Sequence, residues 1–238
     1  MECRANILAE ASEFEAFFES GIEYLEQYNF CGIRLNKETE EPSETETQME
    51  TETEAVIRTE EEAEMGTGVS FVPEQYIMVG DSRFVGMRDA VGEAGCTWIC
   101  QVSAGLSWFT ETAVPQIDAV VRDKSIIIIN MGVNDLGNMM GYVEVLHQKV
   151  PEWMEKGALV YYMSVNPVSR HAYITNEDII SFNNALYGQM PAEMGWIESN
   201  AYLRENGYYA SDGLHYDGAT YQSIFNYCME VISGFHMM

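Results

Sequence analysis

Basic residues are scarce in this chain, which has 12 Lys and Arg against 38 Asp and Glu and a formal net charge of −26. So few cations cannot neutralise a row of phosphates, and we therefore exclude nucleic-acid binding as a function class. The same shortage argues against attachment to an anionic membrane surface.

Long apolar runs are also missing, because no stretch approaches the roughly 20 apolar residues that a membrane-spanning helix needs. The first residues, MECRANILAEASEF, lack the basic start and apolar centre of a signal peptide. We therefore expect a soluble protein with no membrane span in the given chain. Its location is cytoplasmic by default, or extracellular or at the cell surface if the amino terminus has been trimmed.

Cysteines are few, and their number is odd. The chain has 5, at irregular spacing: Cys3, Cys31, Cys96, Cys100 and Cys228. An odd, irregular set is a poor disulfide framework. No paired Cys and His set accompanies Cys96 and Cys100, so we expect buried thiols rather than a metal site.

Composition divides the chain into three parts. Residues 1–36 carry apolar side chains at helical spacing among glutamates, which predicts an amphipathic helical segment over residues 5–29. Residues 37–68 are rich in Thr and Glu and have almost nothing apolar to bury, so we expect a disordered, extended acidic linker. Residues 69–238 have the mixed pattern of a globular domain.

Short apolar runs alternate with helical patterns in this third part. We expect strands over residues 76–79, 97–102, 125–131, 158–165 and 195–198. Helices are expected after residue 82 and over residues 114–121, 139–156, 176–190 (capped by Asn176) and 217–235. The run SIIIINM must be covered on both faces, which indicates a central parallel strand. The pattern predicts an α/β protein, a three-layer α/β/α sandwich with a mostly parallel, five-stranded, flavodoxin-like sheet.

Polar residues and glycines gather where these strands end. Ser82, Gly105, Asn134 and the loop 211–215 all follow predicted strands, and parallel sheets place their working sites at that edge. A serine between strand and helix lies where helix N–H groups can stabilise a developing negative charge. The alternative is an ordinary strand-to-helix turn in which Asp81 or Ser82 caps the helix.

A serine hydroxyl needs a base before it becomes a good nucleophile. His215 is the best candidate among 4 histidines, because Asp212 precedes it by three residues and can hold one ring nitrogen. The amide of Asn134 can donate to an oxyanion, together with the backbone N–H groups of Ser82 and Gly105. The alternatives are that Asp212 only caps the last helix, and that Asn134 is only a turn residue.

Four blocks of the sequence resemble, in order and spacing, those of the SGNH hydrolase family of GDSL-type esterases and lipases. The blocks are Gly80-Asp81-Ser82 with Gly86, then Gly105, then Gly132-Val133-Asn134-Asp135, then Asp212-Gly213-Leu214-His215. The resemblance covers about residues 75–235 and implies ester hydrolysis on sugars, lipids or small acyl groups, without metal or cofactor. It implies Ser82 as nucleophile, His215 as base and Asp212 as the group that orients it. It further implies an oxyanion hole of Ser82, Gly105 and Asn134.

Two departures from the family pattern bear on the substrate. Arg83 stands where lipase-type members carry leucine, which argues against a lipid and for a polar or anionic group nearby. The second block, around Gly105, has only one glycine. The backbone N–H that donates to the oxyanion could therefore belong to a neighbouring residue, as far along as Trp108. We expect Arg83, Trp108 and Asn166 to contact the substrate.

The sequence therefore predicts a serine esterase for short-chain acyl esters, above all acetyl esters, of carbohydrates or other small polar molecules. A lipase or lysophospholipase-type acylhydrolase remains open. So does a non-catalytic glycan-binding or cell-surface module, because fold does not fix function. A flavin-binding domain is disfavoured, since the turn after the first strand lacks a Ser/Thr-rich phosphate cradle.

Overall fold

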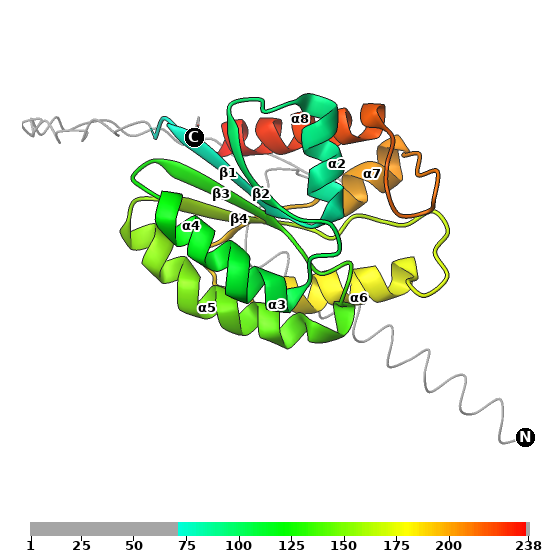
Figure 1. Ribbon diagram of the computed structural model, residues 1–238, viewed down its shortest axis with the longest axis horizontal. Helices are drawn as coiled ribbons and strands as arrows, with labels where there is room; N and C mark the ends of the chain where they lie inside the picture. The colour runs from blue at the N-terminus through cyan, green and yellow to red at the C-terminus, as the bar shows by residue number, and fades with distance from the viewer. Residues whose placement is uncertain (1–70, 237–238) are drawn as a thin grey trace, which may run out of the picture. The chain divides into compact units, whose positions relative to one another are not determined.

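The computed structural model describes residues 71–236, and the expected helix over residues 5–29 and the linker over 37–68 lie outside that range. The described part is built on one sheet of five parallel strands in the order β2-β1-β3-β4-β5 (Figure 1). The strands are β1 (Gln75–Gly80), β2 (Cys96–Cys100), β3 (Ser125–Asn130), β4 (Leu159–Met163) and β5 (Gly195–Ile197). The sheet expected to be mostly parallel is parallel throughout.

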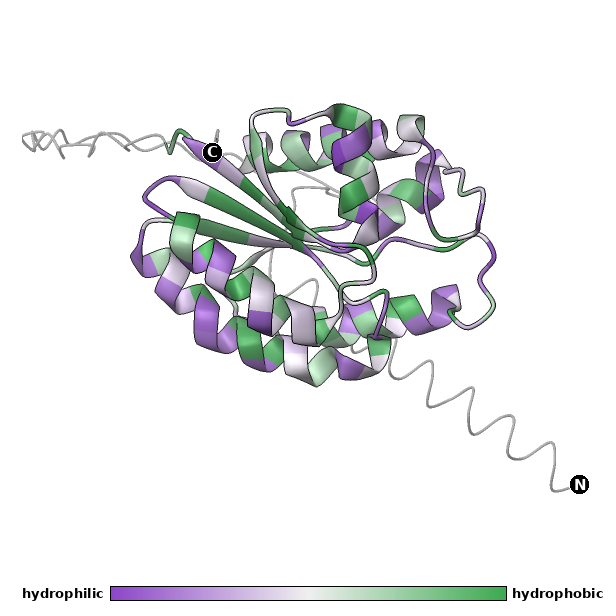
Figure 2. Cartoon of the chain, viewed as in Figure 1, coloured by the Kyte–Doolittle hydropathy of each residue, from purple (hydrophilic) through white to green (hydrophobic). Residues whose placement is uncertain are grey.

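The strand β3 lies in the middle of this sheet and is buried along its whole length. Ile127 and Ile129 face one apolar core, and Ile126 and Ile128 face the other. Figure 2 shows the central strands as the most hydrophobic part of the domain. Alternate side chains of a strand point to opposite faces, so four isoleucines in a row supply both cores at once.

Helices cover both faces and complete the predicted three layers (Figure 1). One face carries α2 (Ser82–Val91), α7 (Ser199–Asn206) and α8 (Gly218–His236). The other carries α3 (Leu106–Trp108), the π-helix η1 (Phe109–Ala113), α4 (Val114–Val120), α5 (Met139–Glu155) and α6 (Asn176–Tyr187). The short 3-10 helix η2 (Leu136–Asn138) precedes α5.

Two helical segments differ from the sequence prediction. The helix expected from residue 114 begins at Leu106, because α3, η1 and α4 follow one another without a break. The π-turn in η1 shifts the apolar side chains off the 3.6-residue period by which a helix is recognised. The helix α7 was not predicted, since its eight residues bury only one apolar side chain, that of Leu203.

The cap of α6 also differs from the prediction. Thr175, not Asn176, caps this helix: its Oγ1 accepts a hydrogen bond from the Asp178 N–H at 3.1 Å, and the Asp178 carboxylate accepts one from the Thr175 N–H. The side chain of Asn176 instead bonds both backbone groups of Val168, at 2.8 and 2.9 Å. Asn176 therefore holds the segment between β4 and α6 against the start of α6.

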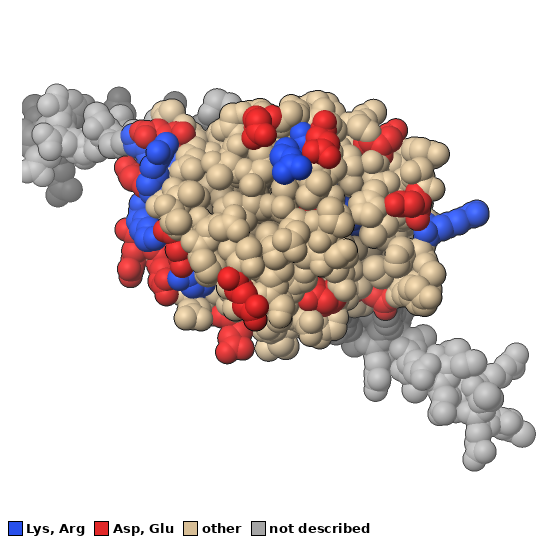
Figure 3. Space-filling model, in the orientation of Figure 1, with Lys and Arg blue, Asp and Glu red and all other residues tan. Residues whose placement is uncertain are grey.

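Most of the surface visible in Figure 3 is uncharged, with scattered acidic and basic side chains. In the view of Figure 3, basic side chains gather mainly at one end of the molecule, where acidic ones lie among them. Among residues 71–236, no helix has both the length and the apolar character needed to cross a bilayer.

Candidate active site

The turn between β1 and α2 presents Ser82 at the first position of the helix. Asp81 caps α2, and its Oδ1 accepts a hydrogen bond from the backbone N–H of Arg83 at 2.8 Å. A side chain at Gly80 would bring its Cβ within 2.5 Å of the Phe84 ring, so the tight turn requires glycine. The expected cap and the expected reactive position therefore coexist, on Asp81 and Ser82 respectively.

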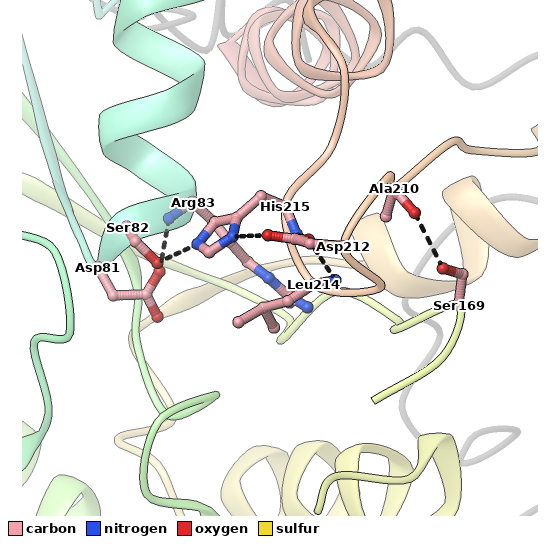
Figure 4. Close-up of polar contacts among 8 residues, drawn as sticks. All are labelled: Asp81, Ser82, Arg83, Ser169, Ala210, Asp212, Leu214 and His215. Carbon is pink, nitrogen blue, oxygen red and sulfur yellow. Dashed lines mark hydrogen bonds and ion pairs between the residues drawn. The ribbon is translucent and has the colours of Figure 1, made fainter. Parts of the chain in front are cut away.

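Ser82, His215 and Asp212 form one chain of hydrogen bonds (Figure 4). His215 Nε2 lies 2.8 Å from Ser82 Oγ, and His215 Nδ1 lies 2.7 Å from Asp212 Oδ2. Asp217 accepts a hydrogen bond from the Thr220 N–H at 2.9 Å in the first turn of α8, which leaves Asp212 free for the histidine. The three residues expected to form a triad thus lie together, although Ser82 is 133 positions from His215 in the sequence.

The ionisation of Asp212 suits this arrangement. Partial burial raises the pKa of its carboxyl group, but the hydrogen bond from the His215 ring and those from the N–H groups of His215 and Leu214 outweigh that effect. Its pKa therefore lies well below the ordinary value. An ionised Asp212 fixes the proton on Nδ1, so Nε2 can accept the proton of the serine hydroxyl.

The expected oxyanion donors are available for a ligand. The sheet register aligns Gly80 with Cys100 and Asn130, so the loops that follow β1, β2 and β3 begin at the same level. Within the described part of the chain, the backbone N–H groups of Ser82 and Gly105 have no hydrogen-bond partner. Asn134 is exposed and donates to the Ala104 carbonyl at 2.8 Å, which leaves its second amide hydrogen free.

Asp135 has a role that the sequence did not reveal. Its carboxylate accepts hydrogen bonds from the Leu106 N–H at 2.7 Å, the Asn138 amide at 3.1 Å and the Tyr142 hydroxyl at 2.6 Å. Burial raises the pKa of Tyr142, and the bond to Asp135 raises it further. A Cβ on Gly105 would lie 2.8 Å from this carboxylate. Asp135 therefore ties the loop of Gly105 to the loop of Asn134.

Asp81 is a second titratable group that sequence reasoning took only as a cap. It is buried, and its Oδ2 has no hydrogen-bond partner. Burial raises its pKa to about 6, because the nearby charge of Arg83 and the hydrogen bond from the Arg83 N–H offset only part of the desolvation. A carboxyl group that titrates near neutrality therefore precedes the serine.

Two expected substrate contacts are wrong. Arg83 is 1% exposed, and its guanidinium donates to the backbone carbonyls of Asn166 and Pro167 at 2.7 and 3.3 Å. Asn166 is also buried, and its side-chain oxygen accepts a hydrogen bond from the Ser199 hydroxyl at 2.6 Å. Both side chains point into the domain, so neither can reach a substrate.

The expected contact of Trp108 with the substrate stays a prediction. Its ring is half-buried against the apolar core beside the sheet, and its Nε1 is buried without a hydrogen-bond partner. Part of this side chain therefore packs against the core, and part of it stays accessible. A helix start at residue 106 could not be recognised from the sequence, so this orientation could not be either.

A groove of about 760 Å³ opens between the loop of Asn134, the start of α6 and the loop that carries Leu214. Asn134, one of the expected oxyanion donors, contributes to its wall, and so does Leu214, the neighbour of His215 in sequence. Its other apolar lining residues are Val133, Leu136, Met139, Ile174, Phe182 and Ala185, and its polar rim includes His171, Tyr173, Asp178 and Ser181. No local sequence pattern predicts this groove, because its lining comes from several separate segments.

Comparisons with known proteins support the fold. No family of known proteins matches the sequence, and no curated protein does. A GDSL-like lipase from Bacteroides thetaiotaomicron superposes with a TM-score of 0.52 at 16% identity, covering 67% of this chain and 88% of its own. A member of the lipolytic G-D-S-L family from Veillonella parvula gives a TM-score of 0.52 at 13% identity, covering 67% and 98%.

A Bacillus subtilis protein also matches, with a TM-score of 0.50 at 14% identity over 67% of this chain, but only 56% of that longer chain is covered. The five parallel strands, the helical layers and these neighbours together define the class: the chain has the fold of the SGNH hydrolases. Two of these structures, those from Bacteroides thetaiotaomicron and Veillonella parvula, are of the G-D-S-L type, as the four sequence blocks predicted.

Proposed function

We propose that this protein is a serine esterase that hydrolyses short-chain acyl esters, above all acetyl esters, of carbohydrates or other small polar alcohols. The observation that carries the proposal is the hydrogen-bonded chain from Ser82 through His215 to Asp212, with distances of 2.8 and 2.7 Å. A module that only binds a glycan has no physical need for a hydrogen-bonded Ser, His and Asp set next to unpaired N–H groups.

The first half of the proposed reaction transfers the acyl group to the enzyme. Ser82 Oγ attacks the ester carbonyl carbon while His215 Nε2 takes the hydroxyl proton. The carbonyl electron pair moves to the oxygen, where the N–H groups of Ser82 and Gly105 and the amide of Asn134 stabilise the charge. When the intermediate collapses, the bond to the alcohol oxygen breaks, and the alcohol leaves with the proton from His215.

The second half releases the acid. A water molecule gives a proton to His215 Nε2 and attacks the acyl carbon, and the same donors stabilise the oxyanion. The bond to Ser82 Oγ then breaks, and the serine recovers its proton from His215. The balance is one ester and one water in, one acid and one alcohol out. Asp212 keeps the histidine oriented and stabilises its charged form in both halves.

The groove is the proposed site of the alcohol half of the ester. Its volume of about 760 Å³ lies within the range of small-molecule sites and far exceeds the needs of an acetyl group. Tyr173, which is 90% exposed, stands at its rim with the ring of His171 at 6.3 Å, and exposed rings of this kind suit a sugar face.

The apolar walls of the groove favour a second candidate function. If the acyl chain rather than the alcohol occupied the groove, side chains such as Met139, Ile174 and Phe182 would bury methylene groups. The protein would then be an acylhydrolase for longer chains. The two candidates share the chemistry at Ser82 and differ in which half of the ester lies in the groove.

The first experiment compares hydrolysis of p-nitrophenyl acetate, butyrate and octanoate by the wild type, Ser82→Ala and Ser233→Ala. Ser233 is an exposed serine on α8 and serves as the control. We expect acetate to be cleaved best, and Ser82→Ala to lose about 10³-fold or more in kcat while Ser233→Ala is unchanged. Equal activity of Ser82→Ala and the wild type would refute the assignment. An inert wild type that binds glycans would support the non-catalytic module.

A second experiment separates the two uses of the groove. Ala185→Trp places a large ring in it, and Asn184→Trp places the same ring on the exposed side of α6. If the alcohol half binds there, Ala185→Trp loses activity on acetylated sugars but keeps it on p-nitrophenyl acetate. If the acyl chain binds there, octanoate hydrolysis falls and hydrolysis of all acetyl esters persists.

A further inference from the structure

The two residues that directly follow Ser82 and His215 contact each other inside the domain. The guanidinium carbon of Arg83 lies 5.4 Å from the ring centroid of Tyr216. Both residues are buried, at 1% and 6% exposure. This is a cation–π contact in a desolvated setting, where such contacts are strongest. The nucleophile and the base are therefore linked twice, once through their own hydrogen bond and once through their neighbours.

One backbone carbonyl joins the two neighbours further. Arg83 Nη2 donates to the Pro167 oxygen at 3.3 Å, and the Tyr216 hydroxyl donates a short hydrogen bond to the same oxygen. Arg83 Nη1 donates to the adjacent carbonyl of Asn166 at 2.7 Å. Pro167 lies between β4 and α6, on a segment separate from those that carry Ser82 and His215. Three segments thus meet at one carbonyl group.

Burying this guanidinium is costly for stability. No carboxylate lies within ion-pair distance of Arg83 in the part of the chain that the structure describes, and its Nε has no partner. Charges are normally buried only when paired, and apolar side chains of similar volume often serve stability as well or better. A buried arginine held by two carbonyls and a ring therefore calls for a reason other than stability.

We propose that Arg83 and Tyr216 are positioning residues that set the separation of Ser82 Oγ and His215 Nε2 through their shared contact with Pro167. The inference rests on the proposed esterase function. The bond between Ser82 and His215 joins residues 133 positions apart, on a helix start and on a loop. Displacements of about 1 Å between reacting groups can cost about 100-fold in rate, so a rigid link one residue away would bear directly on catalysis.

The test compares two single-oxygen deletions. Tyr216→Phe removes the hydroxyl bonded to the Pro167 carbonyl, and Tyr208→Phe removes one bonded to the Val168 carbonyl at 3.0 Å. We expect both to lower stability similarly, since each loses one phenol–carbonyl bond. We expect only Tyr216→Phe to lower kcat, by about tenfold with KM nearly unchanged, because only that residue adjoins a reactive one. Equal kcat values for the two variants would overturn the proposal.

Arginine variants provide a second series. We expect Arg83→Leu to lower kcat by about 100-fold and Arg83→Lys to recover part of the loss, since an ammonium group can still donate to a carbonyl. Arg88→Leu, on the same helix but beside the exposed Asp89, is the matched control. A lysine variant no better than the leucine variant would contradict the claim that hydrogen bonds to the carbonyls set the geometry. Tyr216→Phe decides the matter if Arg83→Leu fails to fold.

A readout that needs no ester separates this inference from the proposed function. Phenylmethylsulfonyl fluoride forms a bond from its sulfur to Ser82 Oγ, releases fluoride and gives the serine proton to His215, and intact mass follows the rate. If esters are inert but labelling is fast in the wild type and slow in Tyr216→Phe, the positioning role holds and the proposed substrate class fails. If labelling is equally fast in both, the positioning role fails. A wild type that neither cleaves esters nor is labelled overturns both proposals.

Discussion

Asp135 Oδ2 accepts a hydrogen bond from the backbone N–H of Leu106 at 2.7 Å, and this bond joins the two loops that carry Gly105 and Asn134. The Tyr142 hydroxyl binds the other carboxylate oxygen at 2.6 Å. One side chain with three donors around it therefore fixes the spacing of two proposed oxyanion donors.

Replacing Asp135 with asparagine should disturb that spacing. In the variant, an NH₂ group replaces one carboxylate oxygen. A donor would then face the Leu106 N–H or the Tyr142 hydroxyl, where the carboxylate had accepted a hydrogen bond. We expect kcat to fall about tenfold or more, and the free energy of unfolding to fall by about 1–3 kcal/mol. Ester kinetics and urea unfolding measure the two effects. Asp89→Asn, at an exposed position, is the control, and unchanged kcat in Asp135→Asn would contradict the prediction.

Removing the side chain of Asn134 should affect the transition state more than substrate binding. We expect Asn134→Ala to lower kcat by about 100- to 1,000-fold with a small change in KM, as is usual for loss of one oxyanion donor. Asn184→Ala, on the exposed side of α6, should match the wild type. A rise in KM at constant kcat would instead assign Asn134 to substrate binding.

The buried carboxyl of Asp81 should make stability depend on pH. Its pKa rises from 3.8 to about 6 on folding. Between these values the folded state keeps a proton that the unfolded state releases, so the free energy of unfolding falls as pH rises through this window. Asp81→Asn lacks this loss. Its stability relative to the wild type should therefore grow by up to about 3 kcal/mol from pH about 4 to about 7, as measured by urea unfolding. A constant difference across that range would show that Asp81 is ionised throughout.

The glycine in the loop before His215 should not tolerate a side chain. Gly213 has φ +86°, and a Cβ there would lie 1.6 Å from the Arg170 carbonyl oxygen. Gly207 has nearly the same φ, +82°, with nothing within 4 Å of its Cβ position. We expect Gly207→Ala to cost about 1 kcal/mol from backbone strain alone, and Gly213→Ala to cost clearly more and to lower kcat. If thermal unfolding shows the same loss of stability in Gly207→Ala and Gly213→Ala, the clash of the Gly213 Cβ with the Arg170 carbonyl makes no contribution.

Much of this fold could be predicted because its signals are local. The four isoleucines of β3 predict a strand that is buried on both faces. The blocks around Ser82 and His215 follow predicted strands, which predicts their place at one edge of the sheet. The unpredicted contacts depend on segments far apart in sequence. From the sequence, Arg83 is a charged residue next to a serine and could face a substrate. Its burial becomes evident only from its hydrogen bond to the Pro167 carbonyl, which lies on a distant segment.

The caps of α6 illustrate a closer competition. Thr175 and Asn176 are both good capping residues and adjacent in sequence, so composition alone cannot choose between them. The choice follows from Val168, whose backbone groups engage the Asn176 side chain. The role of Asp135 could not be predicted either, because its partners Leu106 and Tyr142 lie on other elements.

The 133 positions that separate Ser82 from His215 have a consequence for the protein's synthesis. Ser82 is made early, with its helix and first strand, whereas His215 is among the last residues of the domain to leave the ribosome. A nascent chain that stops before Asp212 contains Ser82 and Gly105 with their unpaired N–H groups. It lacks the histidine proposed as the base for the serine hydroxyl. The proposed reactive pair thus forms only when both segments have been made, and in a chain that stops earlier the proposed nucleophile would lack its base.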